Sequence, residues 1–137
     1  VIKTKAGNSQ LFVAMPGGQD KFSIIYDEKS ELYWLASNLS YNSILNRKYT
    51  NGDNHGQAWS ERNKLALYFS KDAMNWNFAG LIAEGDTDRQ SRAYPHITVQ
   101  NDDLLVVTRC GTAESNTTHD NNIISFHRIS NFRNLVY

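Results

Sequence analysis

Two arginines and a tyrosine in the second half of the chain could hold an anionic or hydroxyl-rich ligand. Arg92 and Tyr94 open an apolar stretch, and Arg109 closes the next one. A guanidinium group presents a planar fork of N–H donors, which suits a carboxylate or vicinal hydroxyl groups. The alternative is a structural ion pair with an acidic residue of the neighbouring loops, namely Asp86, Asp88 or Glu114.

His119 and Asp120 are adjacent and could transfer a proton as a pair. The alternative is that Asp120 only closes an Asx turn ahead of the next strand. Glycoside hydrolysis needs two carboxyl groups at a set separation, and Glu84 and Glu114 add carboxyl groups to the same loops. The candidate catalytic set is therefore Arg92, Tyr94, Arg109, His119 and Asp120.

Lys21 and Trp59 are candidates for substrate contact. Lys21 precedes an apolar strand as Tyr94 does, and Trp59 lies in the polar segment 37–63, where an indole ring could stack on a sugar. The alternative for Trp59 is a ring tucked under a surface loop. The sequence has no Gly-rich phosphate loop, His/Cys metal spacing or nucleophile elbow, so we predict no cofactor.

These residues must be positioned by β-strands. Leu65, Leu67 and Phe69 alternate with less apolar residues, a period of two that is typical of a half-buried strand. Ser70 and Asp72 then predict a tight turn, because their side chains accept hydrogen bonds from nearby backbone N–H groups. Further strands are predicted over residues 11–15, 22–26, 32–36, 94–99, 104–109, 123–129 and 135–137. Very little helix is expected, because no segment carries an apolar stripe of helical period.

Two units of similar design follow one another, over residues 18–82 and 93–137, after one initial strand. Aligning Asn63 with Asn122 places Leu65 on Ile124 and Trp76 on Leu135. Each unit has the strand content of one four-stranded antiparallel propeller blade. The sequence thus predicts an all-β chain forming part of a β-propeller. The alternative is an antiparallel β-sandwich of about nine strands.

Loop lengths alternate along the chain. The long polar connections are 15–21, 37–63, 83–93 and 110–122, and the short turns are 27–31, 70–75, 100–103 and 130–134. In antiparallel blades these two sets emerge at opposite ends of the strands. We therefore expect the long connections to share one face, where a rigid scaffold usually carries its binding site.

Bulk composition excludes several classes of partner. Lysine plus arginine equals aspartate plus glutamate, 14 against 14, which argues against nucleic acid or an anionic membrane held by bulk charge. No apolar run has the length of a membrane span. Cys110 is the single cysteine, so the chain has neither an internal disulfide nor a cysteine metal cluster.

The pattern Ser70-x-Asp72-x-x-x-Trp76 resembles the Asp-box hairpin of sialidases. Residues 21–38, KFSIIYDEKSELYWLASN, and residues 91–112, SRAYPHITVQNDDLLVVTRCGT, look like blades of bacterial sialidase-like (BNR/Asp-box superfamily) proteins. Residues 119–137, HDNNIISFHRISNFRNLVY, look like the last of these blades, and the resemblance covers roughly residues 18–137.

This resemblance implies a propeller, a carbohydrate substrate and glycoside hydrolysis. Sialidases use three arginines on the substrate carboxylate, a Tyr–Glu nucleophile pair and an acid/base aspartate. The resemblance also implies that the remaining blades of the propeller are a partner, and that the protein is secreted or periplasmic. Two other hypotheses remain: a non-catalytic carbohydrate- or protein-binding β domain, and a structural blade segment whose active residues lie elsewhere.

Overall fold

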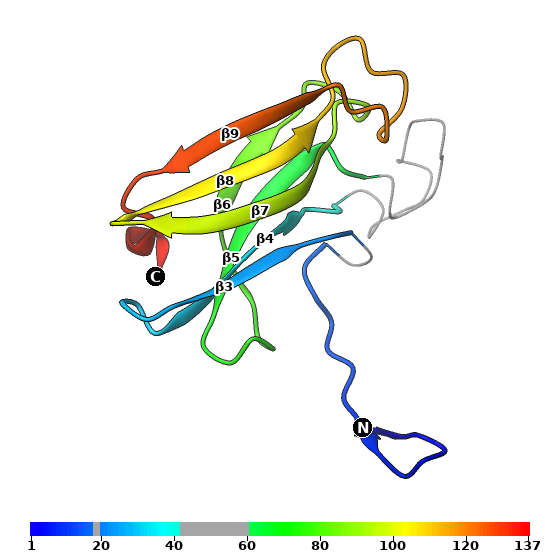
Figure 1. Ribbon diagram of the computed structural model, residues 1–137, viewed down its shortest axis with the longest axis vertical. Helices are drawn as coiled ribbons and strands as arrows, with labels where there is room; N and C mark the ends of the chain where they lie inside the picture. Colours follow the sequence, from blue (N-terminus) through cyan, green and yellow to red (C-terminus); the bar gives the residue numbers. More distant parts are fainter. Residues whose placement is uncertain (18–19, 42–60) are drawn as a thin grey trace.

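The computed structural model describes residues 1–17, 20–41 and 61–137 and is built from antiparallel β-sheets (Figure 1). The first sheet has four strands in chain order, β3 (Ser23–Asp27), β4 (Leu32–Asn38), β5 (Lys64–Ser70) and β6 (Asn77–Glu84). The second sheet has three, β7 (Arg92–Gln100), β8 (Asp103–Cys110) and β9 (Ile123–Ile129). A separate hairpin joins β1 (Ile2–Lys3) to β2 (Ser9–Gln10). Within the described residues, the only helix is the 3-10 turn η3 (Phe132–Leu135).

The all-β prediction is confirmed, with one four-stranded and one three-stranded antiparallel unit. Two predicted strands are wrong. Residues 11–15 form no strand, and Leu11 and Phe12 are largely exposed because no neighbouring segment pairs with them. Residues 135–137 do not begin a strand either. Asn131 adopts φ 50°, which turns the chain into η3 and carries Phe132 into the core.

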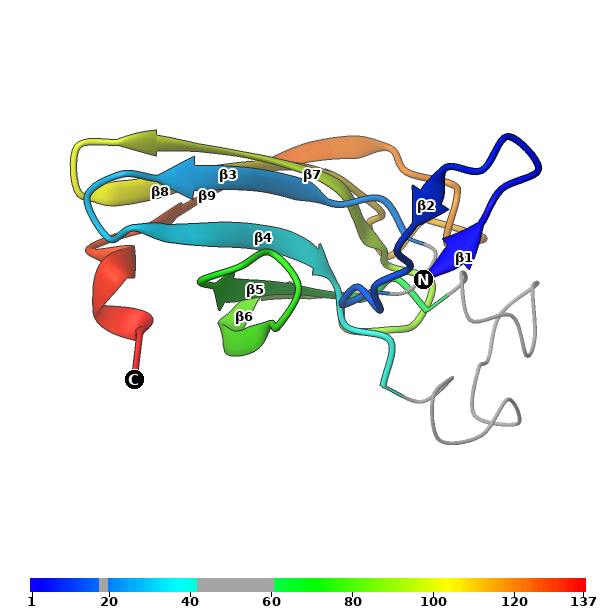
Figure 2. The ribbon, with the colours of Figure 1, turned by 90° about the horizontal axis from the view of Figure 1, so that it is seen from below.

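The two sheets pack face to face, with β3 lying beside β7 (Figure 2). The backbone N–H of Ile97 in β7 donates to Ser23 Oγ in β3 at 3.3 Å. Strand β4 is buried on both faces, which explains why its sequence is apolar without alternation. The core between the sheets consists of Leu32, Trp34, Ala36, Leu65, Leu67, Phe69, Ile97, Leu104, Val106 and Phe132.

Phe132 and Trp34 form the centre of this core. Both side chains are fully buried, and their rings meet edge to face with centroids 4.8 Å apart. Trp34 Nε1 donates to Ser30 Oγ at 3.2 Å, so the indole N–H keeps a partner despite its burial. Phe132, in the turn η3 that follows the last strand, therefore fills the core between the two sheets.

The short turns meet at one end of the strands. Arg133 donates to both oxygens of Asp27, from Nε to Oδ2 at 2.8 Å and from Nη2 to Oδ1 at 2.6 Å. Arg133 Nη1 also reaches Asp102 Oδ1 at 2.9 Å, and Lys29 forms an ion pair with the same carboxylate. Three turns that lie far apart in sequence are thus joined, as the alternation of loop lengths predicts.

The hairpin after β5 agrees with its predicted turn chemistry. Asp72 Oδ1 accepts the backbone N–H groups of Met74 at 2.9 Å and Asn75 at 2.8 Å, and these bonds lower the pKa of Asp72. The Asp-box resemblance implies that Trp76 is largely buried between blades, but the structure buries only part of its side chain. Trp76 is half-buried and packs with Leu35 and Tyr68 on the face of the first sheet that is turned away from the second.

None of the helical structure in the described part of the chain is long and apolar enough to cross a membrane.

We expect Phe132→Ala to lower the free energy of unfolding by about 3–5 kcal/mol, because the truncation opens a cavity between the sheets. Phe12 is the same residue type but is 73% exposed, so Phe12→Ala should change the stability by at most about 0.5 kcal/mol. Urea denaturation monitored by tryptophan fluorescence measures both variants. Equal midpoints for the two would contradict this description of the core.

The hydrogen bonds from Arg133, followed by those from Ser30, lower the pKa of the Asp27 carboxyl to about 2. Since the ionised form is favoured in the folded state, its contribution of about 2 kcal/mol is present above about pH 4 and is lost as the pH falls toward 2. Asp27→Asn should therefore be less stable than the wild type at neutral pH, and the difference should disappear in acid. Thermal melts between pH 2 and 7 test this, and a constant difference would refute it.

Candidate functional site

The long connections meet at the opposite end of the strands, around the side chain of Asn38. Asn38 is 1% exposed, and its Nδ2 donates to the carbonyl oxygens of Arg62 at 3.1 Å, Lys64 at 3.0 Å and Arg92 at 2.9 Å. One amide thereby holds the end of β4 to the starts of β5 and β7. The backbone N–H of Arg92 adds a bond of 2.7 Å to the carbonyl of Arg62.

Tyr94 lies two residues beyond this junction in an unusual backbone conformation. Its φ is 54°, and the pairing of β7 with β8 shifts register between Ala93 and His96. A non-glycine residue in the left-handed region costs on the order of 1–3 kcal/mol and persists only where the surroundings impose it. A bulge of this kind redirects a side chain, and such bulges are frequent beside active sites.

Three cationic groups surround the ring of Tyr94. Lys21 Nζ lies 5.0 Å from the ring centroid, Arg109 Cζ 5.3 Å and Arg62 Cζ 5.4 Å. Each distance is within the range of a cation–π contact. These four residues, Lys21, Arg62, Tyr94 and Arg109, are called the Tyr94 cluster below.

The cluster continues inward through a buried ion pair. Arg62 Nη1 donates to Tyr94 Oη at 3.1 Å, and Arg62 Nε donates to Asp20 Oδ1 at 3.0 Å. The side chains of Arg62 and Asp20 are only 9% and 3% exposed. Asp20 Oδ2 is buried and has no hydrogen-bond partner among the described residues. The acidic group therefore aligns the guanidinium group and retains one unused acceptor.

Burial raises the pKa of the Asp20 carboxyl from its ordinary 3.8 to about 6. The charge and hydrogen bond of Arg62 act in the opposite direction, and the nearby charge of Glu61 adds to the rise. Glu61 is itself buried, and its Oε1 accepts the backbone N–H of Tyr41 at 2.8 Å. The site thus contains two buried carboxyl groups, of which Asp20 bonds to Arg62.

Arg92 has a different environment from the one predicted for it. Its Nη1 donates to backbone carbonyls of Ser91 at 2.9 Å, Gly111 at 3.0 Å and Gln90 at 3.3 Å. These contacts tie the 85–91 connection to the start of the next loop. Arg92 supports the loops beneath the Tyr94 cluster, and the structure does not bring its guanidinium group to the Tyr94 ring.

The loop after β8 places His119 beside the cluster. Arg109 Nη2 donates to the carbonyl oxygen of His119 at 3.5 Å. Partial desolvation, followed by the positive charges of Arg62 and Arg109, lowers the pKa of His119. Asp120 turns back into its own loop, where its Oδ2 accepts the backbone N–H of Asn116 at 2.9 Å. The donor precedes Asp120 by four residues, so this contact holds the 110–122 loop together and is not the Asx turn of the alternative.

Lys21, Tyr94 and Arg109 therefore converge with His119 beside them, whereas Arg92 and Asp120 bond to loop backbone. Trp59 lies outside the described residues. Sequence reasoning missed Asp20, Glu61 and Arg62, which stand in connections read as polar loops. The sequence position of Arg62 could have indicated it, since Arg62 precedes a strand in the first unit as Arg92 does in the second.

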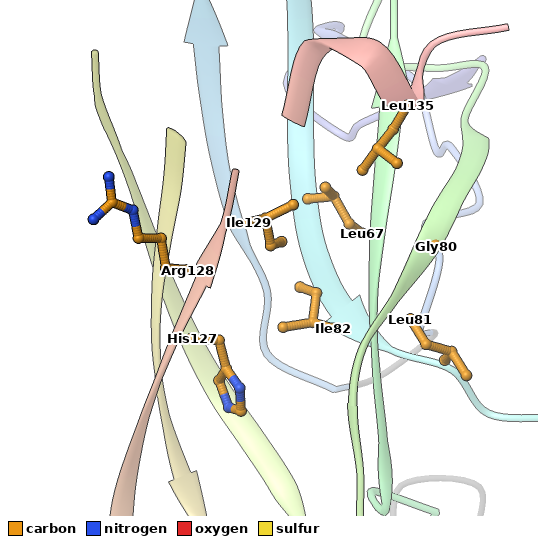
Figure 3. Close-up of a pocket in the computed structure, with 8 residues that line it drawn as sticks. All are labelled: Leu67, Gly80, Leu81, Ile82, His127, Arg128, Ile129 and Leu135. Atoms are coloured by element: carbon orange, nitrogen blue, oxygen red, sulfur yellow. The ribbon is translucent and has the colours of Figure 1, made fainter. Parts of the chain in front are cut away.

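A cavity of about 310 Å³ lies elsewhere, between β6, β9 and η3 (Figure 3). Leu67, Ile82, Ile129 and Leu135 point toward one another in this gap between the sheets, and Arg128 points away from it. Its lining includes none of the Tyr94 cluster. Because this cavity contains none of the residues gathered around Tyr94, we do not place the chemistry there.

Residues 1–17, 20–41 and 61–137 contain no group of three or more His, Cys, Asp or Glu side chains arranged to hold a metal ion. No protein-family model and no curated protein matches the chain.

The raised pKa of Asp20 predicts a pH dependence opposite to that of Asp27. Since the folded state holds the proton more tightly than the unfolded state, the contribution of Asp20 to stability falls by about 3 kcal/mol as the pH rises from about 4 to above 6. Asp20→Asn should lack this decline, because the amide does not ionise. Unfolding free energies measured across this range for both proteins provide the test. Parallel profiles would contradict the protonation of Asp20.

Proposed function

We propose that the chain carries part of the glycan site of a sialidase-like glycoside hydrolase, centred on the Tyr94 cluster. The observation that carries this proposal is the gathering of Lys21, Arg62 and Arg109 around a tyrosine whose backbone is held at φ 54°. Strained backbone and like charges drawn together both cost stability, so a functional role accounts for them better than a structural one.

Binding would use the fixed donors of the cluster. A guanidinium group donates two parallel hydrogen bonds to a carboxylate or a pair of hydroxyl groups, and an ammonium group adds a compact charge. Arg62 is pre-aligned by Asp20 through the 3.0 Å bond, so little freedom is lost when a ligand binds. An acidic or hydroxyl-rich sugar meets both requirements.

Proton transfer would fall to the buried carboxyl groups. A carboxyl group with a pKa of about 6, as at Asp20, is partly protonated near neutral pH and can serve as an acid or a base. Glu61 supplies a second carboxyl group in the same surroundings. Of the residue types that the sialidase resemblance implies, arginines lie around Tyr94, and an aspartate, Asp20, bonds to one of them.

The propeller is part of the same proposal. Two successive antiparallel sheets stack with their first strands side by side, and their long connections share one end, as neighbouring blades would. The partner would then be the rest of a propeller. Secretion or export to the periplasm is proposed on the resemblance alone.

A non-catalytic carbohydrate- or protein-binding β domain is the second candidate. It is favoured by the engagement of both carboxyl groups with protein donors, Asp20 with Arg62 and Glu61 with Tyr41. A catalytic carboxyl group must exchange such a partner for the substrate, whereas a binding site needs only the cations.

Arg109→Leu should lower ligand affinity or kcat/KM by about 10–100-fold, the value of hydrogen bonds to a charged group. The melting temperature should change by no more than about 2 °C, because Arg109 is exposed and its 3.5 Å bond to His119 is long. Arg128→Leu is the matched control. Arg128 Nε donates to the buried carboxyl group of Asp103 at 2.6 Å, so this variant should lose stability and keep binding.

The measurements are hydrolysis of aryl glycosides and of sialyl, fucosyl and arabinosyl substrates, together with calorimetric binding of the same sugars. Turnover that fails in Arg109→Leu supports the hydrolase. Binding without turnover supports the second candidate. Wild-type protein that neither binds nor hydrolyses any of these sugars would overturn both.

A further inference from the structure

The second sheet exposes an apolar strip on the face that is turned away from the first sheet. Val107 is 39% exposed, Phe126 62% and Ile124 66%. Val107 pairs with Phe126 across β8 and β9, and Arg109 pairs with Ile124, so the three apolar side chains lie together on one face. Exposed clusters of this kind commonly mark a surface that binds another molecule.

The internal repeat shows which residues of the first sheet correspond to this strip of the second sheet. In the first sheet, Ala36 pairs with Leu67 as Val107 pairs with Phe126 in the second. Phe126 therefore occupies the position of Leu67. By the same register, Ile124 occupies the position of Leu65, and Val107 that of Ala36. Their counterparts Leu67, Leu65 and Ala36 are at most 1% exposed, because the second sheet covers them. The strip thus repeats, uncovered, the surface with which the first sheet binds a neighbouring sheet.

The complementary surface is present on the same chain. Ile97 and Val99 of β7 face the first sheet in the core. The register of β3 with β4 and of β7 with β8 makes Ile24 and Tyr26 their counterparts. Ile24 is 37% exposed and Tyr26 is 51% exposed. Met15, Leu39 and Trp76 cover the middle of this face, which leaves the β3 strip open.

We infer that a second copy of this chain docks head to tail, with the Ile24–Tyr26 strip of one copy on the Val107–Ile124–Phe126 strip of the other. The occupant is a second copy because both strips are counterparts of surfaces that already pack together inside the chain, where the first sheet meets the second. Each copy therefore exposes one surface of each kind. Such an interface is heterologous, so each copy keeps one open face and association continues into a ring or a filament. This inference rests on the repeat, and the second copy takes the place that the propeller proposal gives to further blades. Because Arg109 pairs with Ile124, the docked copy would lie beside the proposed glycan site.

Sedimentation velocity of the purified chain over a wide concentration range tests the inference. The wild type should form species larger than a monomer as its concentration rises. Phe126→Glu should weaken association by about 100-fold or more, because it replaces an apolar ring in the contact with a carboxylate that must lose water on docking. Phe12→Glu makes the same change at an exposed phenylalanine outside both strips and should associate as the wild type does.

A mixing experiment tests the head-to-tail arrangement. Tyr26→Glu should also block self-association, but it leaves the strip on β8 and β9 intact. A mixture of Tyr26→Glu and Phe126→Glu should therefore form a one-to-one dimer that grows no further. Circular dichroism establishes that the variants are folded, and Ile124→Lys replaces Phe126→Glu if that variant is not. A monomeric wild type at every concentration, or a mixture that stays monomeric, would overturn the inference.

Discussion

The side-chain amide of Asn38 is the contact on which the arrangement of the site depends. It joins the ends of three strands from two sheets by donating to the carbonyls of Arg62, Lys64 and Arg92. The Asn38 amide nitrogen shares its two N–H bonds among these three carbonyls, while Oδ1 is buried without a hydrogen-bond partner among the described residues, so the three donated contacts set the orientation of the amide. The Arg62 and Arg92 carbonyls are held by Asn38, and Tyr94 follows Arg92 by two residues. The backbone from which the Arg62 and Tyr94 side chains start is therefore fixed, and Arg62 Nη1 donates to Tyr94 Oη at 3.1 Å.

An aspartate lies at each end of the sheets, and the pKa values of the two carboxyl groups are shifted in opposite directions. Asp27 accepts several hydrogen bonds from Arg133 and Ser30, and its pKa falls to about 2. Asp20 accepts a hydrogen bond from Arg62 Nε, but its burial outweighs this bond and raises its pKa to about 6. Ionisation of Asp27, at the end of the short turns, therefore stabilises the folded state. Ionisation of Asp20, at the end of the long connections, destabilises it. Regions that bind or react are commonly the ones that accept such a cost.

Residues 123–129 match their predicted strand at both ends, and burial alternates along most of this strand. Strands β4 and β5 were predictable from their apolar content alone, because both of their faces are buried. Lys21, Tyr94 and Arg109 were predictable because each stands where a strand meets a long connection. Asp20 and Arg62 were missed because their contact with each other and with Tyr94 depends on the path of two connections, which no local pattern encodes. Glu61 was missed for the same reason, since its charge acts on Asp20 across those connections. Phe132 was read as part of a turn, but its burial depends on Trp34, roughly a hundred residues earlier. Contacts of such sequence separation have no local signature.

The Tyr94 cluster belongs to neither sheet alone. Asp20, Lys21 and Arg62 come from the connections that lead into the first sheet, and Tyr94 and Arg109 belong to the second. The sheets are held in register by the Trp34–Phe132 core and by the Arg133–Asp27 pair at the far end. A rotation of one sheet on the other would move Lys21 and Arg62 relative to the Tyr94 ring, whereas Arg109 belongs to the same sheet as Tyr94. The geometry of the charged cluster is therefore a consequence of how the two repeated units pack, and it requires both of them.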